Sequence, residues 1–192
     1  MKNRVSNTIF FTDIDYSEII TIINNFGNNK SSDFSIRALK LIKHQIAPLL
    51  AKLFNDCMYS GTFPVELKLA KVIPLFKGGK INIISNYSPI SILPIFSKLF
   101  EKLIYNRLYD FLEANNVLYN KQFGFRRQHS TAHALNTAVS TITQAIDTTY
   151  KRMGIFFIDF SKAFDTINHT ILSKNLNFMA LEVKCYPFWE TI

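Results

Sequence analysis

Cysteine is scarce in this chain of 192 residues, which contains only Cys57 and Cys185. They lie far apart and outside any Cys-x-x-Cys pair, which argues against a disulfide framework and a structural zinc site and is typical of a reducing compartment. No uncharged apolar run approaches the roughly 20 residues of a membrane helix. Residues 1–11 lack the apolar segment of a secretion signal. The sequence therefore predicts an intracellular protein, cytoplasmic or nuclear, that is not secreted.

Acidic residues are also few, with 14 Asp and Glu against 22 Lys and Arg and a net charge of +8. This charge suits a polyanionic partner such as nucleic acid. Tryptophan occurs once, whereas phenylalanine occurs 18 times, so most aromatic side chains are expected in a core and a few are available to stack on bases. The hydrophobic content of 48% is enough for such a core.

Apolar residues recur at three- and four-residue steps in several segments, which predicts amphipathic helices. In the segment over residues 33–59, Pro48 interrupts the apolar pattern, and Gly61 and Pro64 end it. The predicted helices cover residues 16–26, 33–59, 97–113, a segment capped by Ser130 or Thr131 that includes Leu135, Val139, Ile142 and Ile146, and residues 166–175.

Two short segments predict strands. Residues 70–76 are expected to form the first strand, and Gly78-Gly79 after it favours a hairpin turn. Residues 82–89 are expected to form a polar loop. Five of the six residues from Ile155 to Phe160 are large and apolar, which predicts a strand buried on both faces. Asp159 lies at the end of that run. Because burying an unpaired charge is costly, this carboxylate is expected to meet a metal, a cation or several donors, or else to cap the following turn.

Four sequence motifs occur in a fixed order. They are Gly-Thr-Phe-Pro at 61–64 with Lys-Val-Ile-Pro-Leu-Phe-Lys at 71–77, Asn-Tyr-Ser-Pro-Ile-Ser-Ile-Leu-Pro at 86–94, Gln-Phe-Gly-Phe-Arg at 122–126 with His-Ser-Thr at 129–131, and Phe-Ile-Asp-Phe-Ser-Lys-Ala-Phe-Asp at 157–165. Together they resemble the first half of the reverse transcriptases of non-LTR retrotransposons, the LINE and jockey-like elements. The resemblance extends over about residues 10–175.

The resemblance implies an α/β (α+β) fold, with helix-rich fingers followed by the first strand and helix of a right-hand polymerase palm, truncated. It assigns residues 1–60 to an N-terminal helical extension, 61–150 to a fingers-like region and 151–175 to the start of the palm. Residues 176–192 form a divergent tail. The implied activity is RNA-directed DNA polymerisation, with an RNA template, a DNA primer and deoxynucleotides as partners and no membrane.

The same resemblance makes Asp159 the catalytic metal ligand, with the backbone carbonyl of Phe160 as a second possible ligand. The metal would be Mg²⁺ or Mn²⁺, held only if further carboxylates complete the site, because two-metal transfer needs acidic groups from more than one strand. Asp165 is expected to cap a helix rather than bind metal.

Nucleotide contacts are also implied. Arg126 matches an arginine that contacts the triphosphate, which suits its forked donors. Lys77, with Lys71 as the alternative, is expected to assist, unless it belongs to a solvated basic surface. Phe164 matches a residue beneath the incoming sugar, where its ring would exclude a 2′-hydroxyl; ordinary packing is the alternative. The expected nucleic-acid contacts, for which a solvated basic surface is the alternative, are Lys80, Lys121 and Arg127.

The chain departs from the family pattern at Ser88, where an arginine is usual. It also lacks the glycine-rich motif and the paired-aspartate turn that follow in the family. The sequence therefore predicts part of a polymerase that does not catalyse by itself. Two alternatives are a non-catalytic nucleic-acid-binding relic and an unrelated metal-dependent α/β phosphotransfer enzyme.

Overall fold

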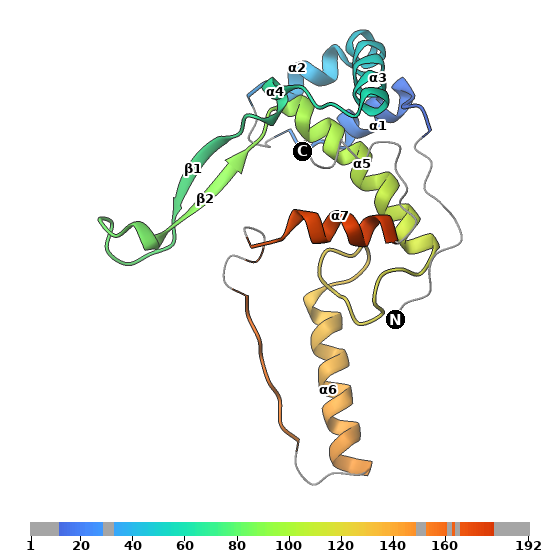
Figure 1. Cartoon of the computed structure of the whole chain (residues 1–192). Helices are drawn as coiled ribbons and strands as arrows, with labels where there is room; N and C mark the ends of the chain where they lie inside the picture. The colour runs from blue at the N-terminus through green and yellow to red at the C-terminus, as the bar shows by residue number, and fades with distance from the viewer. Residues whose placement is uncertain (1–11, 29–32, 149–152, 161–162, 164–165, 179–192) are drawn as a thin grey trace. The chain divides into compact units, whose positions relative to one another are not determined.

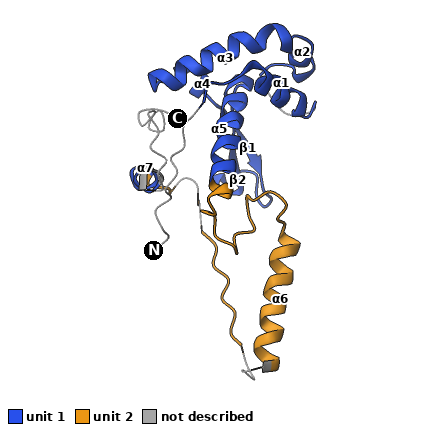
Figure 2. Ribbon diagram, turned by 90° about the vertical axis from the view of Figure 1, so that its right-hand side faces the viewer, with its two compact units in different colours: residues 1–111, 169–192 blue, residues 112–168 orange. Residues whose placement is uncertain are grey.

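A computed structural model describes residues 12–28, 33–148, 153–160, 163 and 166–178 of the chain. Figure 1 shows its helices and its one two-stranded sheet in chain order. The chain divides into two compact units, residues 1–111 with 169–192 and residues 112–168 (Figure 2). The mixed, helix-rich architecture agrees with the predicted fold class. In the described part of the chain, no helix combines the length and hydropathy needed to cross a bilayer.

Helices α1 (Tyr16–Asn25), α3 (Lys43–Ser60) and α5 (Ile95–Ala114) supply most of the core of the first unit. Phe100 of α5 is at its centre and is fully buried. Its ring stacks on Phe54 of α3 at a centroid distance of 4.5 Å and on Phe63 at 5.5 Å. Such offset aromatic stacking adds to the stabilisation from burial alone, so this aromatic trio anchors α3 to α5.

The predicted helix over 33–59 is divided into α2 (Ile36–Leu41) and α3, and the division falls at Ile42. Pro48 lies inside α3 on an exposed position. A proline there removes one backbone hydrogen bond and crowds the carbonyl of residue 44, so the helix depends on the packing of α3 against the core. Gly61 ends the helix with φ +66°, the left-handed conformation that glycine adopts without steric cost.

Helix α5 has defined ends that its own periodicity does not reveal. The carboxylate of Asp33, distant in sequence, accepts a hydrogen bond from the first helical amide, Ile95 N, at 2.8 Å. At the other end Asn116 has φ +52°, and the Val117 amide donates to the Leu112 carbonyl at 2.9 Å. This is a Schellman ending with asparagine in the glycine position. The helix is thus fixed at both ends.

Strands β1 (Lys71–Phe76) and β2 (Tyr87–Ile92) form an antiparallel hairpin. Part of the predicted loop over 82–89 is therefore wrong: residues 87–89 pair with β1, placing Pro74 opposite Pro89. The predicted Gly-Gly turn is confirmed, with φ +121° at Gly78 and +94° at Gly79. A Cβ on Gly79 would lie 2.8 Å from the side-chain amide nitrogen of Asn86, so space also requires glycine there.

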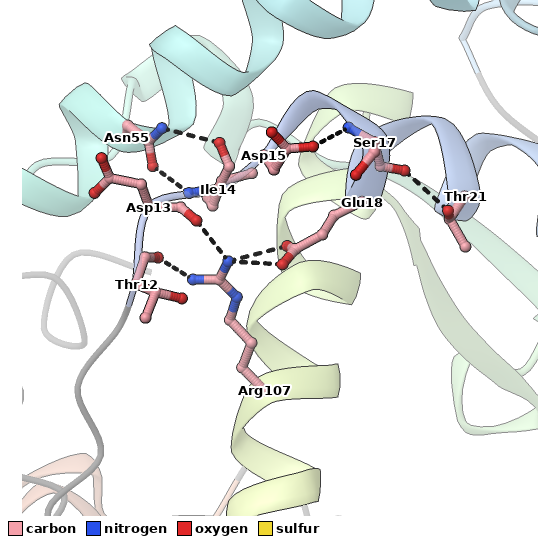
Figure 3. A network of polar contacts seen from close by, with 9 residues as sticks. All are labelled: Thr12, Asp13, Ile14, Asp15, Ser17, Glu18, Thr21, Asn55 and Arg107. Carbon is pink, nitrogen blue, oxygen red and sulfur yellow. Dashed lines mark hydrogen bonds and ion pairs between the residues drawn. The ribbon is translucent and has the colours of Figure 1, made fainter.

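The segment that leads into α1 is attached to α5 by Arg107 (Figure 3). Its guanidinium donates to both carboxylate oxygens of Glu18 at 3.0 Å and to the carbonyls of Thr12 and Asp13. Asn55 of α3 holds the next residue, because it accepts from Ile14 N at 2.7 Å and donates to the Ile14 carbonyl at 3.1 Å. These contacts fix the start of the ordered N-terminal helix on two other helices.

The second unit contains α6 (Thr131–Thr148), which the sequence predicted together with its cap. The Ser130 hydroxyl oxygen accepts from His133 N at 3.3 Å.

Helix α7 (His169–Phe178) begins three residues later than its predicted start at Thr166.

The predicted buried strand over 155–160 is wrong. Residues 153–160 have neither helix nor strand, and Phe157 is 93% exposed. Figure 1 draws them as a trace without an arrow. An apolar run becomes a buried strand only when neighbouring strands satisfy its backbone and cover both faces, and no described segment pairs with it.

Candidate functional site

The connection between β1 and β2 carries two of the predicted contact residues, Lys77 and Lys80, and both are exposed. The Lys77 amide donates to the Asn86 carbonyl at 2.8 Å, while the Asn86 side chain donates to the Lys80 carbonyl at 2.8 Å. The backbone of the turn is thus fixed, and the ammonium groups extend from it. No acidic residue occurs between Glu66 and Glu101, so the whole hairpin is a positively charged ribbon.

Aromatic rings lie next to these lysines. Phe76 and Tyr87 face each other across the ribbon with ring centroids 5.2 Å apart, and the Tyr87 hydroxyl donates to the Ile81 carbonyl at 2.9 Å. Phe76 is exposed and Tyr87 is half-buried. Basic groups together with accessible rings are a combination that binds single-stranded nucleic acid through charge and stacking. The sequence suggested Lys77, and Tyr87 as a possible template contact, but not the pairing of Phe76 with Tyr87.

Arg126 lies in the loop between α5 and α6, and its side chain is only 15% exposed. Its Nε and one terminal nitrogen donate to the two carboxylate oxygens of Glu113 at 2.8 and 2.9 Å, and the other terminal nitrogen donates to the Tyr119 carbonyl at 3.2 Å. A two-pronged pair of this kind combines charge with fixed geometry. Arg126 therefore fastens the loop to the last turn of α5.

The loop around Arg126 turns through two left-handed residues, Phe125 with φ +58° and Gln128 with φ +60°. Lys121 and Arg127 lie on it with exposed side chains, which fits contacts with nucleic acid and a solvated basic surface equally. His129 Nδ1 is 2.9 Å from the Arg127 carbonyl, and its ring lies 6.3 Å from that of His133. Each histidine thus has neighbours within its own loop or helix.

A cavity of about 380 Å³ lies in the second unit. It is lined by Lys121 and Phe123 of the loop, by the small residues of α6 from Ala134 to Thr141, and by residues 153–156. Its walls are mostly apolar, with Lys121 as the charged group at the margin. This cavity is the place in the second unit where the loop and the apolar segment before Asp159 approach the same helix.

Asp159 and Phe160 lie in the exposed segment, and the predicted metal site has no further ligands there. Among the residues that the structure describes, no group of three or more His, Cys, Asp or Glu side chains is close enough to share a metal ion. Mg²⁺ needs near-octahedral oxygen ligands, so the described residues do not fit a complete magnesium site. Phe164 and Asp165 lie outside the described residues.

The structure thus groups the predicted residues into two sets. Lys77 and Lys80 belong to the first unit, whereas Lys121, Arg126, Arg127 and Asp159 belong to the second. Glu113, which holds Arg126, was missed by sequence reasoning. Thirteen residues separate the two, across a helix end and an irregular loop, and no periodic pattern connects them.

Comparison with known families gives an independent result. Residues 77–191 match the family model described as reverse transcriptase (RNA-dependent DNA polymerase). The chain belongs to the reverse transcriptase family, as its motifs predicted.

Curated relatives from Drosophila melanogaster agree. The chain is 34% identical over 134 residues to the RNA-directed DNA polymerase from mobile element jockey, a match that covers 69% of this chain and 14% of the relative. It is 36% identical over 132 residues (68% and 14%) to the probable RNA-directed DNA polymerase from transposon BS. For the corresponding protein from transposon X-element the identity is 32% over 162 residues, covering 82% and 18%. The matched region is therefore less than a fifth of each relative's length.

Proposed function

We propose that this chain supplies the template- and nucleotide-contacting part of an RNA-directed DNA polymerase of a non-LTR mobile element. The observation that supports this most is the basic ribbon of β1 and β2, which carries Lys77 and Lys80 beside a pair of aromatic rings and overlaps the start of the family match. An RNA template, a DNA primer and deoxynucleotides are the proposed partners, inside the cell.

Catalysis requires more than the described residues offer. Asp159 is the proposed metal ligand, with the Phe160 carbonyl beside it, and a divalent ion would there neutralise charge on the reacting phosphate. Because the described residues include no group of three or more His, Cys, Asp or Glu side chains that could hold a metal ion, we propose that the 192-residue chain binds nucleic acid without extending a primer. The non-catalytic binding protein is thus the second candidate function. Family membership argues against an unrelated phosphotransfer enzyme.

The test measures binding of a short RNA–DNA hybrid by the full chain at several salt concentrations. Affinity should fall steeply with salt because phosphate contacts release counterions. Lys77→Ala and Lys80→Ala should each reduce the salt slope by about one. Lys52→Ala, on α3, makes the same charge change away from the ribbon and should leave the slope unchanged. A slope that responds equally to all three substitutions would contradict a role for the ribbon.

Primer extension on a primed RNA template completes the test. We expect no product with Mg²⁺ or Mn²⁺. Extension that Asp159→Ala abolishes would show that the chain holds a complete catalytic site, and the binding-only proposal would then be wrong.

A further inference from the structure

A groove of about 610 Å³ lies between helix α5 and the end of strand β2, both in the first unit. Only Leu93 and Pro94 separate the strand from the helix, so β2 leads directly into α5 (Figure 1). Residues 90–92 form the strand side of the groove, and Phe26, the residue after α1, also lines it. The groove, called here the α5 groove, therefore begins where the basic hairpin ends.

The helical wall of the α5 groove presents charged and aromatic side chains. They are Lys98, Glu101, Lys102 and Tyr105. At 100° per residue, these four positions fall within an arc of about 100°, so they share one face of the helix. Tyr105 is 41% exposed, and Lys102 is exposed one turn before it. Two ammonium groups against one carboxylate give this wall a net positive charge.

The ring of Tyr105 is held in place and carries a cation. Tyr109, which is buried, lies beside it with ring centroids 5.6 Å apart and limits its movement. Lys102 Nζ lies 4.3 Å from the centroid of the Tyr105 ring, a cation–π contact. At an exposed site such a contact is weaker than the stacking of a nucleobase on a ring. A base can therefore replace the ammonium on the ring, while the flexible lysine keeps its charge within reach of the adjoining phosphate.

We propose that the α5 groove binds a nucleotide of single-stranded RNA, with its base stacked on Tyr105 and its phosphate at Lys102. This inference rests on the proposed function, because the same strand would contact Lys77 and Lys80 on the hairpin. Residues 87–92 of β2 extend over about 17 Å at about 3.3 Å per residue, a distance that a few nucleotides cover. Proteins that bind single strands combine a track of positive charge with rings on which successive bases stack.

A duplex fits the α5 groove less well than a single strand. Bases inside a duplex are stacked on one another, so a protein ring cannot reach a base face unless the duplex opens, whereas an unpaired base is free to stack on a side chain. Glu101 repels phosphate, which places the backbone of the strand on the Lys102 side of the ring.

The experiment measures binding of a fluorescent single-stranded RNA of about 12 nucleotides to the full chain by anisotropy, at several salt concentrations. Tyr105→Ala should weaken binding by at least about fivefold, as loss of a stacking ring does. Lys102→Gln should weaken binding at low salt and reduce the salt slope by about 0.7, as loss of one phosphate contact with a single strand does. Glu101→Gln removes a negative charge from the same wall and should strengthen binding.

Three control variants locate the contact. Tyr105→Phe keeps the ring and should change affinity by less than about twofold. Tyr16→Ala removes a tyrosine that is 53% exposed on α1 and does not line the groove, and it should also change affinity by less than about twofold. Lys52→Gln, on α3, should leave the salt slope unchanged. Thermal melts should show that all the variants fold, because each of these positions is exposed.

The same RNA tests the ribbon and the groove separately. If Lys77→Ala and Lys80→Ala weaken binding but Tyr105→Ala and Lys102→Gln do not, the groove proposal is wrong and the proposed function stands. The reverse result would support the groove and reject the role of the ribbon. If none of the four substitutions weakens binding, or the RNA does not bind, both proposals are wrong.

Two further outcomes would overturn the groove proposal alone. A loss with Tyr105→Phe as large as that with Tyr105→Ala would assign binding to the hydroxyl group and not to stacking. An equal loss of affinity for double-stranded RNA with Tyr105→Ala would show that the groove receives a duplex.

Discussion

Phe100→Ala should lower the free energy of unfolding strongly, whereas Phe157→Ala should hardly change it. Phe100 is fully buried and stacks on Phe54 and Phe63, so Phe100→Ala removes a core side chain and leaves a cavity. Such changes cost about 3–5 kcal/mol. Phe157 belongs to the apolar run that the sequence assigned to a core, yet it is 93% exposed. Phe157→Ala should therefore change the free energy of unfolding by less than about 0.5 kcal/mol.

Urea unfolding monitored by circular dichroism measures both changes. Because the two residues lie in different units, separate unfolding of the units would move only one transition for Phe100→Ala and none for Phe157→Ala. In thermal melts the Phe100 change corresponds to about 2–4 °C per kcal/mol for a chain of this size. A cost of several kcal/mol for Phe157→Ala would mean that the apolar run is packed in solution, and the description of residues 153–160 as exposed would be refuted.

Three further predictions concern the side chains of Arg126, Glu101 and Arg107. Arg126→Lys keeps the charge but loses the forked contact with Glu113, so it should cost about 1–2 kcal/mol locally and speed amide hydrogen exchange over residues 117–129; unchanged exchange would contradict the fastening role. Glu101 is exposed at the surface of α5, but neighbouring protein atoms displace part of its hydration and raise its pKa above the ordinary value of 4.5, partly offset by Lys98. The contribution of Glu101 to stability is present below its unfolded pKa and is lost as pH rises through its folded pKa. Glu101→Gln should therefore raise the melting temperature at pH 7 but not below pH 4.5. A gain at both pH values would refute this prediction. Arg107→Ala should free the segment before α1 and lower stability by about 1–3 kcal/mol, less if Glu18→Gln is already present; full additivity in that double-mutant cycle would show that the pair is not coupled.

Local patterns predicted the elements whose structure depends on nearby residues. The helix over 97–113 is confirmed within two residues at each end, because its apolar stripe and its packing on the core agree. The glycine pair at 78–79 predicted a turn because few other residues adopt those backbone angles. In the same way Ser130 marked the start of α6.

The predictions that were wrong concern structure that depends on residues distant in sequence. The run over 155–160 has the composition of a buried strand, but composition cannot supply the neighbouring strands that bury it. The polar residues before Ile90 resembled a loop because no residue of β2 is fully buried, so the strand needs no continuous apolar face. Among the candidate site residues, the exposure of Lys77 and Lys121 was predictable from their charge, whereas the contact between Arg126 and Glu113 arises from the fold of the intervening loop. The functional roles of these residues remain predictions.

The facing prolines of the hairpin determine how other chains can approach it. Lys77 and Asn86 form a hydrogen-bonded pair, and pairs alternate along an antiparallel ladder, so Pro74 and Pro89 occupy a position whose amides would point outward from both edges. Neither residue has an amide hydrogen. Each outer edge therefore lacks its central donor, and a third strand could not pair along its full length. The exposed valine, isoleucine and phenylalanine side chains of the ribbon are accordingly less prone to extended sheet-like self-association, because an added strand could pair with each edge only on one side of its proline.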